Sequence, residues 1–263
     1  MQMNHIFTTL ISFILIINNI WCSPVRRKNE TDSLPKPLED AKFFLGDILL
    51  TQHDNSNLNS KSPLVFRNAL KVDDNLWSYA TIPIEIDPIL SERIGNQIVS
   101  ALEEYHMKSC IRFVERNEER DYIRFIYDDG CYSSVGRIGG MQTVSLGNGC
   151  HCRGTIIHEL MHALGFYHEH NRSDRDDYVE IISENIKPGL ESMFLRLSPR
   201  ENRLLTPYDY DSISHYDGEA FGKGGSQTMI PKDPKAKLKH PCEKNELSVL
   251  DIEKLNGLYQ CDK

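Results

Sequence analysis

Between residues 81 and 146, the alternation of apolar and polar positions predicts a sheet and one helix. Four short runs rich in β-branched and aromatic residues are typical of strands, at 81–86, 111–115, 122–127 and 142–146. Residues 91–106 instead carry apolar side chains at helical spacing and begin with Ser91, a favoured N-cap residue. The apolar positions of this helix are Ile94, Ile98, Ala101, Leu102 and Tyr105. We expect residues 144–146 to form a sheet edge that can pair with an extended peptide.

A second helix is predicted around residues 154–164. Its apolar positions are Ile156, Ile157, Leu160, Met161 and Leu164, which would bury it in a core. Thr155 could cap its start, and Gly165 could end it because glycine readily takes positive φ. Beyond Tyr178 the pattern is less regular until a helical stretch at 247–259. The chain therefore predicts an α+β fold with a regular first half and a less regular second half.

The first 67 residues have a different character. Residues 6–21 are an apolar run followed by the small residues Cys22 and Ser23, which fits a signal peptide cleaved near that point. The usual lysine or arginine before the run is missing, and an uncleaved anchor is the alternative. Residues 24–67 are rich in charge, Pro, Asn and Ser and would not build a core, apart from an apolar island at 43–48.

Composition restricts the partners and the compartment. A net charge of −8 and a pI near 5.7 argue against nucleic acid or an anionic membrane, because both require a concentrated basic face. The chain has 7 cysteines, and loss of Cys22 with the signal peptide leaves an even number, which suits an oxidising compartment. We therefore expect a secreted protein. Six cysteines allow fifteen pairings, among which composition alone does not choose.

Three histidines and a glutamate in one short run indicate a catalytic metal site. His158 and His162 are four residues apart, so on a helix their imidazoles leave one face about 40° apart in azimuth. A turn at Gly165 would bring back His168 as a third nitrogen ligand. Three imidazoles with an open fourth position are typical of catalytic zinc, and Glu159 is placed to take a proton from bound water. The alternative, purely structural histidines, leaves the spacing unexplained.

The same run holds the pattern H-E-x-x-H-x-x-G-x-x-H of the metzincin metalloproteases. With the residues that follow, His168-Glu169-His170, Arg172, Asp174-Arg175-Asp176 and Tyr178, the chain resembles the astacin family of secreted zinc endopeptidases. The resemblance covers about Asn68 to Cys261. It implies a two-subdomain zinc protease domain with the active-site cleft between the halves, one Zn²⁺ per chain on His158, His162 and His168, and Glu159 as the catalytic base.

The resemblance also implies a zymogen. In the family, a pro-segment motif F-x-G-D places its aspartate on the zinc, and Phe44, Gly46 and Asp47 match it. Asp47 is therefore the candidate latency ligand, with an ordinary turn aspartate as the alternative. Activating cleavage is expected between Arg67 and Asn68, shortly before the Leu-Trp pair near which the family's mature chain begins. We expect a signal peptide at 1–22, a pro-segment at 23–67 and a catalytic domain at 68–263, with no accessory domain after it.

Three further roles follow from the family. The new amino terminus on Asn68 is expected to be buried near Glu169, unless Glu169 is only an exposed carboxylate at a helix end. Tyr216 corresponds to the tyrosine that touches the zinc at rest and then hydrogen-bonds the reacting carbonyl oxygen, with a packed surface tyrosine as the alternative. Ser214 stands where the family's Met-turn S-x-M-H-Y has methionine. The missing thioether predicts a softer metal site with intact ligands.

For the disulfides, the resemblance implies the pairs Cys110–Cys261 and Cys131–Cys150. Cys152 and Cys242 remain, and we predict that they form a third bridge, with free or intermolecular thiols as the alternative. Two sequons make Asn29 and Asn171 candidate glycosylation sites.

These features predict a secreted, monomeric zinc endopeptidase that is made as a zymogen, is cut by an activating protease and acts on proteins or peptides. No nucleic-acid or membrane partner is expected. The alternative from another class is a secreted zinc-binding protein of the same fold without catalysis, which the departure at Ser214 favours.

Overall fold

The computed structural model describes residues 44–49, 75–199 and 203–261, all within one compact unit that spans Pro35–Lys263. The predicted signal peptide, the cleavage point at Arg67 and Asn68, and the sequon at Asn29 lie outside the described residues. No helix among the residues described is long and apolar enough to cross a membrane.

The first half is built on a five-stranded sheet with the strand order β2-β1-β3-β5-β4. Its elements are β1 (Thr81–Ile86), α3 (Pro88–Lys108), β2 (Arg112–Glu115), β3 (Tyr122–Ile126), β4 (Cys131–Ser133) and β5 (Met141–Leu146). All pairings are parallel except that of β4 with β5. The four predicted strands are confirmed within about a residue. The helix begins three residues before Ser91, because Asp87 accepts a hydrogen bond from the backbone N–H of Ile89 and Pro88 occupies the first turn.

One prediction about the sheet is wrong. Residues 144–146 belong to β5, which lies between β3 and β4 and is therefore not an edge. The edge strand is β4, whose three residues are too few to show an alternating pattern in the sequence. Tyr132 of β4 pairs with Ser145, so the backbone groups of β5 on that side are already used.

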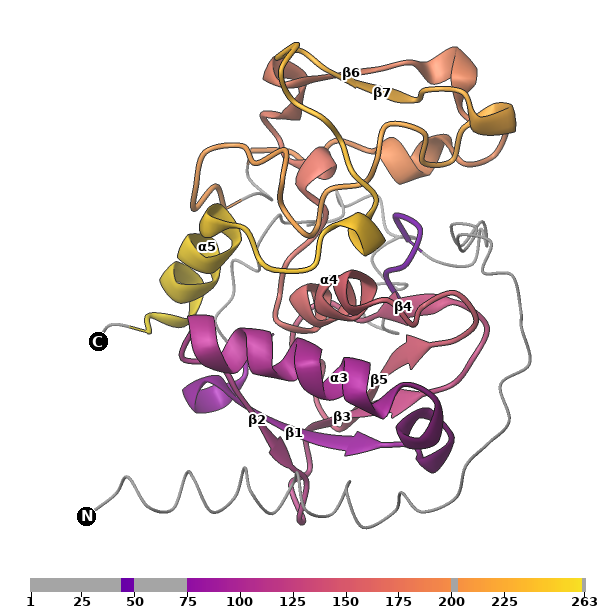
Figure 1. The fold of residues 1–263 in the computed structure, drawn as a ribbon. Coiled ribbons are helices and arrows are strands. Elements are labelled where there is room, and N and C mark those ends of the chain that lie inside the picture. The colour runs from indigo at the N-terminus through magenta and orange to yellow at the C-terminus, as the bar shows by residue number, and fades with distance from the viewer. Residues whose placement is uncertain (1–43, 50–74, 200–202, 262–263) are drawn as a thin grey trace, which may run out of the picture. The chain divides into compact units, whose positions relative to one another are not determined.

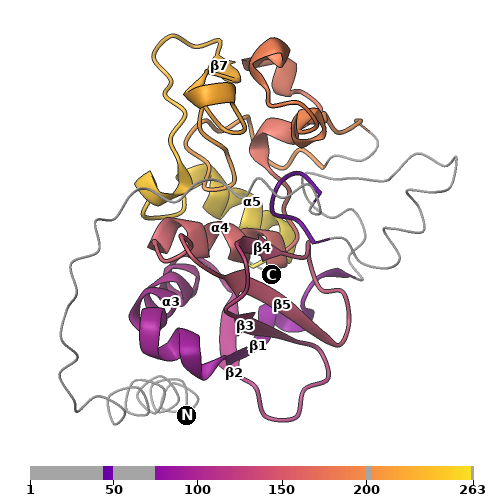
Figure 2. The same ribbon diagram turned by 90° about the vertical axis from the view of Figure 1, so that its right-hand side faces the viewer.

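The central helix α4 (Arg153–Ala163) lies between the sheet and the C-terminal segments (Figures 1 and 2). Residues 154–163 are all buried, and α4 packs against α3, β4 and β5. From α3, the Tyr105 hydroxyl donates to the carbonyl of Ile157 at 2.7 Å. The predicted cap at Thr155 is wrong: Cys152 is the N-cap, without a side-chain hydrogen bond, and Thr155 lies inside the helix.

The second half contains little regular structure, as predicted. Its two strands, β6 (Val179–Ile181) and β7 (Met229–Pro231), pair antiparallel, and α5 (Val249–Tyr259) follows. Ser248 caps α5 in a reciprocal pair with Asp251, which sets the start of the predicted helix. Short 3₁₀ turns also occur in this half: η3 (Glu169–Asn171), η4 (Arg175–Asp177), η5 (Ser183–Asn185), η6 (Glu191–Phe194), η7 (Lys223–Gly225) and η8 (Pro241–Glu243). One further 3₁₀ turn, η2 (Ser78–Ala80), directly precedes β1.

Three disulfides connect these elements, and all three predicted pairs are confirmed. Cys110–Cys261 joins the end of α3 to the residues after α5. Cys131–Cys150 joins β4 to the segment before α4, and Cys152–Cys242 joins the start of α4 to η8. The alternative of free thiols at Cys152 and Cys242 is thereby excluded.

Candidate metal centre and cleft

Three histidines converge on one carboxylate. From α4, His158 Nε2 lies 3.0 Å from Asp47 Oδ2 and His162 Nε2 lies 3.5 Å from Asp47 Oδ1. After α4, Gly165 takes φ +107°, and the turn brings His168 Nε2 to 3.0 Å from Asp47 Oδ1. The four potential ligand atoms lie within 4.8 Å of one another. The structure therefore brings together the three histidines predicted from their spacing and the aspartate predicted from the F-x-G-D match.

The chemistry of this set fits a cation. The ring Nδ1 of His158 contacts the carbonyl of Ile213 at 2.8 Å, and that of His162 contacts the carbonyl of Phe166 at 2.7 Å. Because a carbonyl only accepts, each Nδ1 carries the proton, and each Nε2 lone pair faces inward. The two Nε2 atoms are 3.0 Å apart, so two lone pairs and a carboxylate would repel one another without a positive ion between them. Three imidazole nitrogens and one carboxylate oxygen suit Zn²⁺.

The pKa shifts agree with this assignment. Burial lowers the pKa of His158 and lowers that of His168 to about 4, so both rings are neutral and free to act as ligands. Burial alone would raise the pKa of Asp47, but the neighbouring His168 and His162 hold it well below its usual value. Asp47 is therefore a carboxylate.

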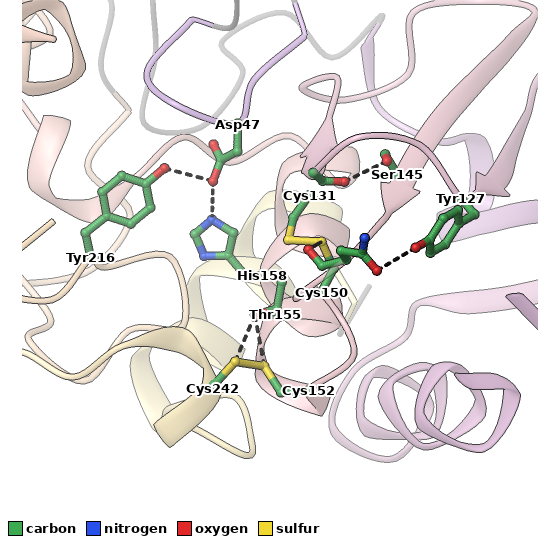
Figure 3. The surroundings of a disulfide bond; sticks show 12 residues. Asp47, Tyr127, Cys131, Ser145, Cys150, Cys152, Thr155, His158, Tyr216 and Cys242 are labelled. Atoms are coloured by element: carbon green, nitrogen blue, oxygen red, sulfur yellow. Dashed lines mark hydrogen bonds and ion pairs between the residues drawn. A yellow bond between two sulfur atoms is a disulfide. The ribbon is translucent and has the colours of Figure 1, made fainter. Parts of the chain in front are cut away.

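Asp47 is carried by a tight loop that rests on both halves of the domain. The loop closes on itself through paired backbone hydrogen bonds between Phe44 and Ile48, at 2.9 and 3.0 Å. It is also attached to the edge strand β4: Ser133 donates its N–H to the carbonyl of Asp47, and Leu49 donates to that of Ser133. From the second half, the Tyr216 hydroxyl donates to Asp47 Oδ2 at 2.8 Å, so Asp47 lies between Tyr216 and His158 (Figure 3).

Glu159 is buried beside this centre. It lines the same cleft as His158, and its Oε2 has no hydrogen-bond partner among the described residues. Burial, followed by the nearby charge of Asp47, raises the pKa of Glu159 well above its usual value. A buried carboxyl with a raised pKa next to a metal site is suited to exchanging a proton at neutral pH.

The comparisons with known proteins decide the family. Residues 69–260 match the family model for Astacin, which is described as a peptidase family. The chain belongs to the astacin family. This agrees with the extent of the resemblance, from about Asn68 to Cys261.

Several astacin relatives are similar over most of this chain. Zinc metalloproteinase nas-13 of Caenorhabditis elegans is 43% identical over 233 residues, which cover 83% of this chain and 50% of that protein. Astacin-like metalloprotease toxin 1 of Loxosceles intermedia is 44% identical over 200 residues, which cover 74% and 75%. The chain spans about half the length of the first curated relatives it matches, at 50%, 56% and 52%.

Among solved structures, high choriolytic enzyme 1, a hatching enzyme zinc-protease from Oryzias latipes (medaka), superposes with a TM-score of 0.68 at 40% identity. The match covers 74% of this chain and all of that one. The predicted α+β astacin fold is thereby confirmed.

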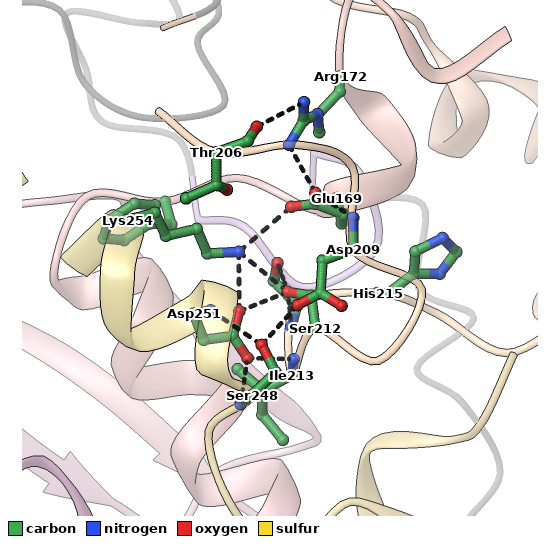
Figure 4. A network of polar contacts seen from close by, with 12 residues as sticks. Glu169, Arg172, Thr206, Asp209, Ser212, Ile213, His215, Ser248, Asp251 and Lys254 are labelled. Atoms are coloured by element: carbon green, nitrogen blue, oxygen red, sulfur yellow. Dashed lines mark hydrogen bonds and ion pairs between the residues drawn. The ribbon is translucent and has the colours of Figure 1, made fainter. Parts of the chain in front are cut away.

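In this astacin domain, Ser214 stands where a methionine was expected, and its side chain belongs to a buried polar network. Its hydroxyl contacts that of Ser212 at 3.0 Å, and Ser212 donates in turn to Asp251 Oδ1 at 2.6 Å. The carbonyl of Ser214 accepts from the N–H of Glu169, the residue after the third histidine, at 3.2 Å. Figure 4 shows how Lys254 joins these groups. Hydrogen bonds therefore hold the turn at residues 212–214, whereas the sequence indicated only that a thioether is missing there.

Glu169 is fully buried, so the alternative of an exposed carboxylate is wrong. Arg172 Nη1 donates to Glu169 Oε1 at 2.7 Å, and Lys254 Nζ donates to Glu169 Oε2 at 3.2 Å. Although burial disfavours the ammonium, Asp251 and Glu169 raise the pKa of Lys254. Both oxygens of Glu169 therefore already face cations of the astacin domain itself.

The predicted glycan at Asn171 is contradicted. Its side chain is 0% exposed, and Nδ2 donates to the carbonyls of Met193 and Leu195 at 3.2 and 2.7 Å. A sugar on Nδ2 would require breaking both bonds and opening the core. The sequon is therefore unusable in the folded astacin domain.

Sequence reasoning missed the lysines that support the site. Lys254 lies three residues after Asp251 on the buried face of α5, a spacing that could have revealed an internal ion pair. Lys244 is also buried and donates to the carbonyls of Ser212 and His215 at 2.8 and 2.7 Å, and nothing in its sequence context indicates this.

Proposed function

We propose that this chain is a secreted, zinc-dependent endopeptidase made as a zymogen, with Asp47 as its latency ligand. One observation carries the proposal: three imidazoles converge on a point whose remaining side is covered by a carboxylate from outside the matched domain. His158, His162 and His168 would hold the ion, and Asp47 would leave on activation. When bound, zinc supplies Lewis-acid chemistry, polarising a carbonyl group and making water more acidic.

Two side chains act on the reacting groups. Glu159 takes a proton from the attacking water on its unpartnered Oε2 and delivers it to the nitrogen of the leaving amine. In the structure, the Tyr216 hydroxyl donates to Asp47 Oδ2 and to the carbonyl of Leu45. Departure of Asp47 and its loop would free this hydroxyl. That hydroxyl can then donate to the oxygen of the scissile carbonyl as negative charge develops there.

The edge strand β4 is the surface for the substrate backbone. Ser133 now offers its N–H and its carbonyl to residues 47–49. A peptide that replaces this loop would find the same donor and acceptor free, and backbone pairing of this kind tolerates many sequences. This supports action on proteins or peptides, with β4 as the strand that binds them.

The zymogen assignment supplies the remaining roles. A signal peptide at 1–22 and a pro-segment at 23–67 would precede the domain, and a separate protease would cut between Arg67 and Asn68. The three disulfides support an oxidising, extracellular location. Glu169 would receive the new amino terminus of Asn68, which must then join or displace Arg172 or Lys254. The active form would be a monomer.

Casein cleavage tests the proposal. The trypsin-treated precursor should cleave casein, lose activity on zinc chelation and regain it when zinc is restored. Glu159→Gln should keep stoichiometric zinc and lose cleavage, whereas Asp47→Ala should cleave casein before any trypsin treatment. Zinc binding without cleavage by the processed wild type would instead support a non-catalytic zinc-binding protein, and absence of stoichiometric zinc would refute both.

A further inference from the structure

The phenol ring of Tyr216 lies against four other rings. Their centroids are 4.3 Å away for His168, 4.7 Å for His170, 5.5 Å for Phe221 and 5.9 Å for His158. His158 and His168 belong to the candidate metal set, whereas His170 does not. The His170 ring stacks on the Tyr216 ring at an interplanar angle of 29°, while the Phe221 ring is tilted by 57°. His170 therefore offers Tyr216 a flat face that metal binding does not require.

The backbone around His170 is fixed on both sides. His170 lies in η3, and its carbonyl accepts a hydrogen bond from Arg175 Nη1 at 3.0 Å. The residue before it, Glu169, donates its N–H to the carbonyl of Ser214, and the residue after it, Asn171, donates from Nδ2 to two carbonyls. The His170 ring itself is 0% exposed. His170 is therefore a rigid support for the rings that pack against it.

Hydrogen bonding contributes little at the His170 ring. Its Nε2 contacts the carbonyl of Met193 only at 3.4 Å, and its Nδ1 has no hydrogen-bond partner among the residues that the structure describes. A buried polar atom without a partner lowers stability, so the two nitrogens do not account for the side chain at this position. What the side chain provides is contact with neighbouring rings: His168 at 5.2 Å, Phe194 at 5.8 Å and Tyr216.

Loss of the Asp47 loop makes this support important for Tyr216. In the structure, the Tyr216 hydroxyl donates to Asp47 Oδ2 at 2.8 Å (Figure 3) and to the carbonyl of Leu45 at 3.2 Å. Both acceptors belong to the loop that the proposed activation removes. Once they are gone, the position of the phenol ring depends on its contacts with the neighbouring rings. A stacked ring can hold it, because aromatic pairs add stabilisation beyond the burial of their surfaces.

We propose that His170 is a positioning residue for Tyr216: its imidazole holds the phenol ring in the cleft after the Asp47 loop has left, so that the hydroxyl stays within reach of the scissile carbonyl. This inference rests on the proposed function, in which Tyr216 donates to that carbonyl oxygen. The role requires a flat ring at position 170 and no titrating group. It predicts an effect on turnover and none on substrate binding, because the hydrogen bond strengthens as charge develops on the oxygen.

Steady-state kinetics with fluorescein-labelled casein test the role. The processed, zinc-loaded His170→Leu protein should have a kcat about twofold to tenfold below that of the wild type with KM unchanged, as expected for the loss of one aromatic contact. His170→Phe keeps a flat ring and should recover most of the lost turnover. In a Tyr216→Phe background, which lacks the hydroxyl, His170→Leu should cause no further loss. An unchanged kcat in His170→Leu, or the same loss in both backgrounds, would overturn the proposal.

A matched control separates positioning from a general loss of packing. His106 is also a stacked histidine, 6.0 Å from Phe113, but it lies on α3 and does not line the cleft. His106→Leu should therefore leave kcat per bound zinc unchanged, whatever it costs in urea unfolding. If His106→Leu lowers kcat per bound zinc as much as His170→Leu does, the effect of His170→Leu is a packing defect and the proposal fails.

Fluorine NMR tests the contact without catalysis. In processed protein labelled with 3-fluorotyrosine, the Tyr216 line is identified by its absence from Tyr216→Phe. In His170→Leu this line should move toward the position of free 3-fluorotyrosine, because the ring loses its fixed surroundings. A line that keeps its wild-type position would overturn the proposal. If the line moves as expected but the processed, zinc-loaded wild type cleaves no casein, the proposed function is refuted, and the support of Tyr216 by His170 stands.

Discussion

Lys254→Met removes a buried cation from behind the metal site. Lys254 is 2% exposed, and its Nζ lies 2.8 Å from Asp251 Oδ1, 3.2 Å from Glu169 Oε2 and 2.9 Å from Ser212 Oγ. Methionine has nearly the same length and leaves no large cavity, so the change acts mainly through the lost charge. The buried carboxylates of Glu169 and Asp251 then lose the cation that they share.

Breaking a buried ion pair from one side costs about 3–5 kcal/mol. Here each carboxylate keeps other donors: Asp251 retains the N–H groups of Ile213 and Ser248, and Glu169 retains Arg172. We therefore expect the lower end of that range, about 3 kcal/mol, and a fall in melting temperature of about 6–12 °C for a domain of this size. Because Glu169 follows His168 directly, zinc should also dissociate faster in a chelator competition assay.

Urea unfolding with the disulfides intact measures the cost. The matched control is Lys239→Met, whose ammonium pairs with Asp211 at 3.1 Å while 47% exposed, and which should cost at most about 1 kcal/mol. If the two variants unfold within about 1 kcal/mol of each other, the network in Figure 4 does not stabilise the domain.

Three shorter predictions concern latency, the third disulfide and pH. Gly46→Ala should make the uncut precursor cleave casein, because its Cβ would lie 2.8 Å from Tyr216 Oη and 2.7 Å from Phe221 Cζ; Gly189→Ala, also at positive φ but in open space, should stay latent. Replacing both Cys152 and Cys242 by serine should cost about 2–4 kcal/mol in urea unfolding, and an unchanged midpoint would refute this. Burial lowers the pKa of Lys244 to about 8, below the value of about 10.4 for an unfolded lysine. Between these two pH values the folded state binds fewer protons than the unfolded state. Lys244 therefore makes the domain more stable as the pH rises from about 8 to about 10.4. Unfolding free energies of wild type and Lys244→Met should therefore diverge between those pH values, and parallel curves would contradict the assignment.

Local spacing was sufficient to predict that the three histidines converge. His158 and His162 lie one helical turn apart, and Gly165 forms the turn that returns His168, so no distant residue decides their geometry. Four of the five strands of the first half could likewise be predicted, because each is a β-rich run bounded by polar residues. The resemblance supplied Asp47, which lies 111 positions before His158 and could not be placed by spacing.

Features that depend on contacts between distant segments of the chain could not be predicted from the sequence. Which strand forms the sheet edge is decided by β4, whose three residues carry no period. The sequon at Asn171 gives no sign that the side chain is turned inward toward residues 193–195. At Ser214 the sequence shows a missing thioether, whereas the compensating groups, Asp251 and Lys254, come from a helix near the end of the chain. Burial of polar side chains is a tertiary property, and composition does not reveal it.

The Cys152–Cys242 disulfide affects how the protein responds to cleavage by other proteases. It encloses the chain from the start of the central helix to the wall of the cleft, with a sequence separation of 90, and Cys110–Cys261 encloses that loop within a larger one of 151. If another protease cut one peptide bond inside the smaller loop, both disulfides would still join the two fragments covalently. Such a clipped molecule would keep its parts in register under non-reducing conditions and would separate into two pieces only after a reductant is added.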